Sequence, residues 1–181
     1  MKFKVAGLSL ALALGLLNAG SVSLASTITV KGSGTLTFVS SSFTFDGGPA
    51  IQLTGSGKDN LGGQYTFQGV SEFGATVISC MAPDGTTGLQ FDLVSSATII
   101  NYNSGQLFGS TGASSSNHEC ISESSESFGG TVTYGASGGT GKFAAATGNF
   151  TETFAGHFVA VGATGATFGA EQITTTGSVT K

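Results

Sequence analysis

The chain has 181 residues, with six lysines, no arginine and ten acidic residues, so its formal net charge is −4. Nucleic acids and anionic membrane surfaces are bound through clustered Lys and Arg, so this sparse, acidic set of charges excludes both as partners. Thirty glycines suggest low complexity, but 14 phenylalanines provide the material of a hydrophobic core. We therefore expect a folded chain and not a disordered one.

The first 25 residues have the features of a signal peptide. Two lysines precede an apolar stretch at residues 5–17, and small residues at Ser23 and Ala25 form a cleavage site before Ser26. The apolar stretch is too short for a membrane span and no second one follows, so we expect no membrane anchor. The sequence predicts a secreted or periplasmic protein whose residues 26–181 form a single domain.

Short runs rich in Thr, Val, Ile and Phe recur between glycine clusters along the rest of the chain, and no segment shows a helical apolar period. Such runs predict β-strands separated by turns. The predicted strands cover residues 27–30, 35–38, 51–53, 64–68, 76–80, 89–93, 97–102, 106–109, 131–134, 150–158 and 172–179, with a bulge at Ser95–Ser96 between the sixth and seventh. Three aspartates, Asp46, Asp59 and Asp84, lie in predicted turns, where their side chains bond the backbone; a calcium ion held by their oxygen atoms is the alternative.

This pattern predicts an all-β fold, a single antiparallel β-barrel of about eight strands. A jelly-roll-like β-sandwich has nearly the same pattern, so it is the alternative. A barrel of this size has room for packed side chains or for one small ligand.

A polar, acidic stretch at residues 112–127 interrupts the strands, and we expect it to be a long surface loop. Glu119, Glu123 and Glu126 within it are spaced as a solvated run of charge without a calcium-binding framework. We predict no metal site and no cofactor.

Cys80 and Cys120 are the two cysteines of the chain. In an exported protein an even pair predicts one disulfide. The alternative is a thiol or metal pair with His118, but a fourth zinc ligand is missing.

The segment Gly138-Gly139-Thr140-Gly141-Lys142-Phe143, followed by residues 144–148, resembles a turn of the dirigent and allene oxide cyclase barrels, and of small exported bacterial proteins with the same barrel-like pattern. In such a turn the glycines adopt positive φ and Phe143 plugs the barrel end. The resemblance implies an eight-stranded antiparallel barrel and a homo-oligomer, since the plant families are often trimeric. The pocket residues of those families have no counterparts at matching positions, so no activity is carried over.

Residues 150–158 raise the main functional question. Phe150, Phe154 and Phe158 share one face of a strand with Glu152, whereas His157 lies on the opposite face. If this face lines the barrel, burial raises the pKa of the glutamate, which can then orient a ligand or transfer a proton. Alternatively, Glu152 lies at a wet rim, bonds a nearby Tyr or Thr, or faces outward beside an oligomer contact.

The sequence therefore favours a non-enzymatic binding module for a small hydrophobic ligand. The predicted ligand-binding residues are Tyr65, Phe67, Phe150, Glu152, Phe154 and Phe158. One alternative is a structural surface protein that self-associates. A weaker alternative is a cyclase- or isomerase-like enzyme that steers a reactive intermediate, with Glu152 as the candidate catalytic residue.

Overall fold

The computed structural model describes residues 26–111, 116–161 and 166–179, so the predicted signal peptide lies outside the described residues. The elements are β1 (Ser26–Ser40), β2 (Ala50–Asp59), β3 (Gly63–Met81), β4 (Thr87–Tyr102), β5 (Gly105–Thr111), β6 (His118–Ser122), β7 (Ser127–Gly139), a short 3₁₀ helix η1 (Gly141–Phe143), β8 (Thr147–Val161) and β9 (Thr167–Val179).

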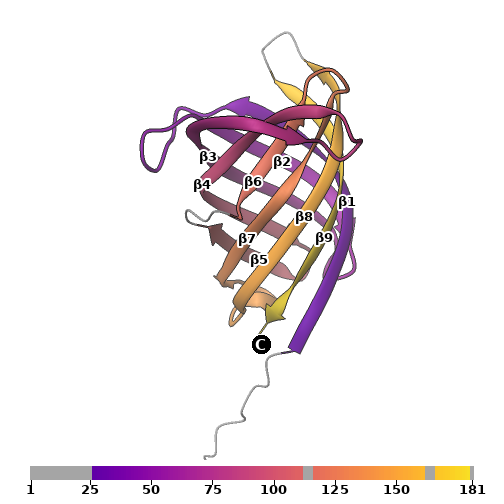
Figure 1. Ribbon diagram of the computed structural model, residues 1–181. Helices are drawn as coiled ribbons and strands as arrows, with labels where there is room; N and C mark the ends of the chain where they lie inside the picture. Colours follow the sequence, from indigo (N-terminus) through magenta and orange to yellow (C-terminus); the bar gives the residue numbers. More distant parts are fainter. Residues whose placement is uncertain (1–25, 112–115, 162–165, 180–181) are drawn as a thin grey trace, which may run out of the picture.

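The strands close into one antiparallel ring (Figure 1). β1 pairs with β2 on one side and with β9 on the other, which joins the first described strand to the last. β5 pairs with the second half of β4 and β6 with the first half, and both pair with β7. β5 and β6 therefore share one position, and the ring is an eight-stranded barrel, which confirms the predicted fold class.

Glycines on the inner face of the barrel make room for aromatic rings from the adjacent strand. Gly55 lies opposite Phe67 and Gly57 opposite Tyr65 in the β2–β3 register. A Cβ atom at Gly57 would come within 2.6 Å of the Tyr65 hydroxyl oxygen, and one at Gly55 would collide with the Phe67 ring. Aromatic side chains commonly cover glycines in sheets in this way. The high glycine content thus serves the packing of large rings inside a narrow barrel.

The turn between β7 and β8 closes one end of the barrel, which we call the η1 end. Gly138 and Gly141 have φ values of 102° and 57°, which glycine adopts without strain. Phe143 is buried, and its ring centroid lies 5.1 Å from that of Tyr102. Lys142 Nζ donates a hydrogen bond of 3.0 Å to the Leu61 carbonyl oxygen, which connects this turn to the turn between β2 and β3.

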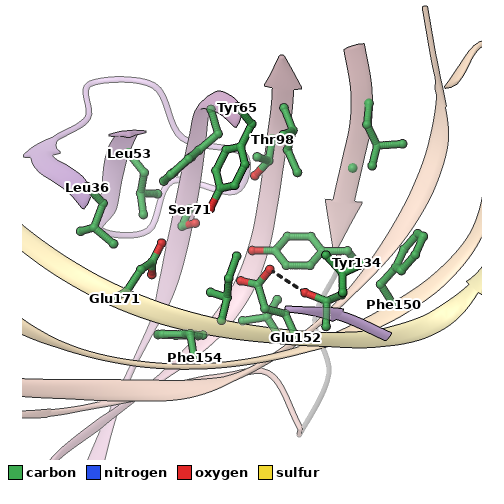
Figure 2. A pocket seen from close by; sticks show the side chains of 18 of the residues that line it. Leu36, Leu53, Tyr65, Ser71, Thr98, Tyr134, Phe150, Glu152, Phe154 and Glu171 are labelled. Atoms are coloured by element: carbon green, nitrogen blue, oxygen red, sulfur yellow. Dashed lines mark hydrogen bonds between the residues drawn. The ribbon is translucent and has the colours of Figure 1, made fainter. Parts of the chain in front are cut away.

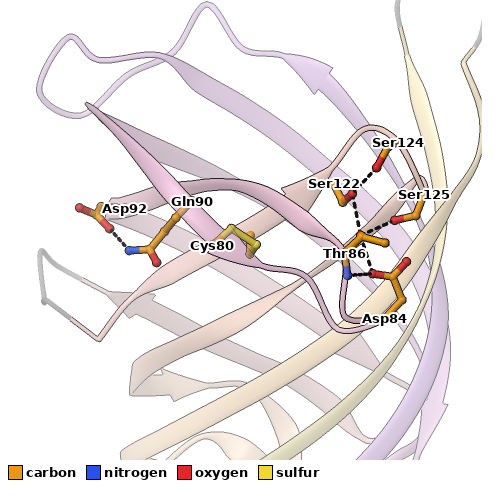
Figure 3. Close-up of a disulfide and its surroundings, with 9 residues drawn as sticks. Cys80, Asp84, Thr86, Gln90, Asp92, Ser122, Ser124 and Ser125 are labelled. Carbon is orange, nitrogen blue, oxygen red and sulfur yellow. Dashed lines mark hydrogen bonds between the residues drawn. A yellow bond between two sulfur atoms is a disulfide. The ribbon is translucent and has the colours of Figure 1, made fainter.

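A disulfide fastens the other end of the barrel (Figure 3). It joins Cys80 of β3 to Cys120 of β6, with 6.1 Å between the Cα atoms, and confirms the predicted pair. Nearby, the Thr86 hydroxyl donates to Asp84 at 2.7 Å and lies 2.8 Å from the Ser122 hydroxyl. The tip of the β3–β4 hairpin is therefore held against the turn between β6 and β7.

The prediction of a surface loop over residues 112–127 was wrong in its second half. Residues 118–122 form β6, which is bonded to strands on both sides and carries the disulfide. The strand prediction was also too finely divided, because residues 64–68 and 76–80 belong to the single strand β3. The register of β3 against β4 shifts between Glu72 and Val77, opposite the region where the bulge was predicted.

Candidate functional site

The interior of the barrel holds a cavity of about 180 Å³ to which every strand contributes side chains (Figure 2). Leucine, isoleucine, valine and phenylalanine side chains make most of its wall, including Leu36, Leu53 and Phe154. Polar side chains interrupt this wall at a few positions. Those positions are where a ligand would be oriented.

Five of the six residues predicted to bind a ligand line this cavity, namely Tyr65, Phe67, Phe150, Glu152 and Phe154. Phe158 does not belong to the cavity wall. Its ring stacks on Phe128 with 4.7 Å between centroids and meets the edge of Phe38 at 5.9 Å. The Phe158 ring therefore packs behind the cavity wall, and a ligand-binding role for it remains a prediction.

Glu152 projects from β8 into the cavity, where its neighbours in register are Val132 of β7 and Thr175 of β9 (Figure 2). Thr175 Oγ1 donates a hydrogen bond of 3.4 Å to Glu152 Oε2. Burial raises the pKa of Glu152 to about 7, and the Thr175 hydrogen bond offsets part of that rise. His157 is exposed on the outer face of β8, so the two side chains form no dyad.

Two further glutamates line the same cavity, and sequence reasoning missed both. Glu119 of β6 is only 8% exposed, and burial raises its pKa to about 7. Burial raises the pKa of Glu171 in β9 to about 8, and the negative charges of Glu152 and Glu119 add to the rise. Three carboxyl groups from three strands therefore face one apolar space.

The reasons for these omissions are local. Glu119 was assigned to a solvated loop because serine and glutamate dominate its neighbourhood, so the prediction that it is solvated was wrong. Glu171 alternates with Ile173 and Thr175, which was a usable signal, but the predicted strand began one residue too late to include it. Glu123 and Glu126 are exposed, as predicted.

Three tyrosines complete the polar wall of the cavity, and burial raises the pKa of each above its ordinary value. Tyr102 Oη donates a hydrogen bond of 2.6 Å to Asp59 Oδ2. Tyr65 Oη is buried and, among the described residues, has no hydrogen-bond partner. Tyr134 lies beside Glu152 in Figure 2. No lysine belongs to the wall in the part of the chain that the structure describes.

Among residues 26–111, 116–161 and 166–179, no three His, Cys, Asp or Glu side chains are arranged to hold a metal ion. Within the same ranges no helix is long and apolar enough to cross a membrane.

The fold and the site together define a closed antiparallel β-barrel with an internal, acid-lined cavity. No protein-family model matches the chain, and no curated protein matches it. One solved structure, described as pyocyanin demethylase, is similar with a TM-score of 0.39 and 15% sequence identity, over 81% of this chain and 99% of that chain. A similarity at this level supports no argument about function.

Proposed function

We propose that this protein is a binding module that takes a small, largely apolar molecule into the barrel. The observation that carries this proposal is the cavity of about 180 Å³ beside Glu152. Apolar cavities of roughly 150 Å³ hold a benzene molecule, so a ligand of one or two rings fits this space. A barrel serving only as a structural core would be filled by its own side chains.

Apolar and polar side chains of the cavity wall contribute to binding in different ways. Phe67, Phe150 and Phe154 remove apolar ligand surface from water, and burying about 150 Å² contributes roughly 4 kcal/mol. Loss of translational and rotational freedom on binding costs about as much or more. Apolar burial alone therefore gives weak binding, and the polar groups, Glu152 among them, must orient the ligand and add affinity.

A cavity-filling variant tests this proposal. Gly109 lines the cavity, and a Cβ atom there would meet nothing closer than 3.9 Å, so Gly109→Leu places a side chain in the open space. Gly135→Leu is the matched control, since its Cβ atom meets only Asn149 and Ser110 atoms at 3.7 and 3.8 Å, and both of these residues are exposed. We expect propylbenzene, measured by titration calorimetry, to bind the wild type and Gly135→Leu but not Gly109→Leu. Failure of the folded wild type to bind propylbenzene or any other one-ring probe of similar size would contradict the proposal.

A second candidate function is self-association through the outside of the barrel. One observation favours it: apolar side chains are exposed on the β3–β4 hairpin, at Val77, Ile78, Met81 and Leu89. Val77, Met81 and Leu89 share one face of the hairpin and Ile78 lies on the other, and exposed apolar side chains of this kind are typical of protein contacts. Sedimentation velocity over a range of concentrations tests this candidate, with Ile78→Ser expected to abolish any oligomer and a monomer at all concentrations contradicting it.

A further inference from the structure

We infer that the ligand of this cavity is an organic cation, an apolar body with one protonated amine, held by Glu119, Glu152, Glu171 and Tyr65. The inference rests on the proposed function and specifies its ligand class. It is drawn from the charges that face the cavity, from one unsatisfied hydroxyl and from the aromatic wall.

The ionisable groups that face the cavity are predominantly acidic. Glu119, Glu152 and Glu171 come from three different strands, and Asp59 joins them near the η1 end, where the Tyr102 hydroxyl and two backbone N–H groups bond it. His118 is the one potential base of the described wall, and its Nδ1 lies 3.1 Å from the Ser116 carbonyl oxygen.

Buried carboxylates are costly unless a positive group compensates them. The wall supplies no lysine for this purpose in the described part of the chain, and the sequence contains no arginine. A ligand amine would provide the missing counter-charge. A neutral ligand gains no such pairing, and an anionic ligand would be repelled by the ionised carboxylates.

Tyr65 is a second and independent indication of a polar ligand. Its side chain is only 6% exposed, its hydroxyl oxygen lacks a hydrogen-bond partner among the described residues, and it lines the cavity. Figure 2 shows the Tyr65 hydroxyl pointing into the space that Glu152 and Glu171 also face. Native proteins satisfy nearly all buried hydroxyls, so this oxygen, which has less than 1 Å² of accessible surface, would gain its missing partner from a ligand N–H group that reaches it.

Aromatic rings make the rest of the wall suitable for a cation. Tyr65, Tyr134 and Phe150 line the cavity close to the carboxyl groups (Figure 2). A desolvated cation over an aromatic face gains about 2 kcal/mol. A protonated amine can therefore contact carboxylates with its N–H groups while its apolar part lies against the rings.

Cation binding should be coupled to proton release. Burial holds the pKa values of Glu119 and Glu152 at about 7 and that of Glu171 at about 8, so part of these groups is protonated in the empty barrel near neutrality. The three tyrosines stay neutral because burial raises their pKa values. A bound ammonium group favours the ionised carboxylates, so they release protons and the affinity rises with pH through this range.

Three probes of similar shape test the inference by titration calorimetry near neutral pH. Phenethylamine carries a positive charge, propylbenzene is neutral and 3-phenylpropanoate is negative. We expect phenethylamine to bind at least about tenfold more tightly than propylbenzene, a difference of about 1.4 kcal/mol, and 3-phenylpropanoate not to bind. Titrations in two buffers of different ionisation enthalpy should show protons released on amine binding.

Variants locate the effect in the cavity. Glu152→Gln and Glu171→Gln should each weaken phenethylamine binding about tenfold and leave propylbenzene binding unchanged. Tyr65→Phe should weaken amine binding without lowering the melting temperature. Glu123→Gln is the control, because Glu123 is exposed between β6 and β7, and it should change neither affinity.

Each other outcome is informative. Propylbenzene binding as tightly as the amine would overturn the cation inference and leave the proposed function standing. Preferred binding of 3-phenylpropanoate would overturn it as well, since the carboxyl groups would then act as protonated donors. Absence of binding by all three probes to folded protein would overturn both proposals.

Discussion

Two tyrosines of the cavity wall differ in what their hydroxyl groups do. Tyr102 donates to Asp59, whose Oδ1 atom also accepts the backbone N–H groups of Leu61 and Gly62 at 2.9 Å each. Tyr65, 5.9 Å away between ring centroids, has an unsatisfied hydroxyl among the described residues. One hydroxyl thus contributes to stability and the other remains available for a ligand.

This contrast predicts different effects of the same substitution. Tyr102→Phe leaves the buried Asp59 carboxylate without its O–H donor and should destabilise the protein by about 1–3 kcal/mol. Tyr65→Phe removes a buried hydroxyl that bonds nothing, so in the absence of ligand the free energy of unfolding should stay the same or rise. Urea unfolding of both variants measures the difference, and equal losses would contradict this account of the two hydroxyls.

Buried glutamates also differ, and hydrogen bonds decide which of them is ionised. The Glu72 carboxylate accepts the backbone N–H groups of Asp46, Gly48 and Phe45, and these bonds lower its pKa. Among the described residues Glu119 has no such donors, and burial raises its pKa to about 7. Glu72 therefore anchors the loop between β1 and β2 as an anion, whereas the cavity glutamates are readily protonated.

At the scale of elements, the disulfide secures the region where pairing is most irregular. It links two strands that both pair with β4, between the shifted register in β3 and the tip of the β3–β4 hairpin. The hairpin tip gains further support from Thr86, whose hydroxyl also lies 2.9 Å from that of Ser125. Covalent and polar links together hold a segment that carries exposed apolar side chains.

Removing the disulfide should be costly. The bond closes a loop with a sequence separation of 40, for which the chain-entropy treatment gives about 4 kcal/mol. We expect Cys80→Ser combined with Cys120→Ser to lower the free energy of unfolding by up to that amount, as measured by urea unfolding. Wild type in reductant should behave as the double variant does, and an unchanged unfolding midpoint in both would refute the stabilising role.

The local sequence pattern predicted the strands in which apolar and polar residues alternate. It failed for a strand that forms only through pairing with segments far along the chain. Alternation in residues 64–68 and 150–158 was enough to place Tyr65, Phe67 and Glu152 on one face. The sequence did not predict β6 because the segment His118–Ser122 is short and polar. It forms a strand because it pairs with β4 on one side and β7 on the other. Glu119 was missed with it, since no local signal indicates that a polar strand will be buried by partners far along the chain.

For the molecule as a whole, the cavity acids make stability depend on pH. The pKa values of Glu119, Glu152 and Glu171 in the folded state lie near 7, 7 and 8, above their ordinary value of 4.5. Between pH 4.5 and these raised pKa values the folded state binds more protons than the unfolded state. The stability that the three glutamates contribute therefore falls as pH rises. Glu72 and Asp84 have lowered pKa values, so their contribution is lost toward acid pH.

The melting temperature should therefore be highest near pH 5 and decline between about pH 5.5 and 8.5. Glu171→Gln, which replaces the most strongly shifted acid by a neutral isostere, should flatten that decline. Scanning calorimetry over this pH range measures both effects. A melting temperature that increases from pH 5.5 to 8.5 would show that the cavity carboxyl groups are solvated in the folded protein.

The pairing of β1 with β9 has a consequence for biosynthesis. Ser26 lies opposite Val179, so the ladder that completes the ring joins the two ends of the described chain. A ribosome makes the amino-terminal strand first, and that strand must wait for the last one with one edge uncovered. Until then the polypeptide exposes a strand edge with unpaired backbone N–H and C=O groups, which can pair with other chains. Folding without aggregation therefore depends on rapid closure of the barrel or on a chaperone that binds the unfolded chain.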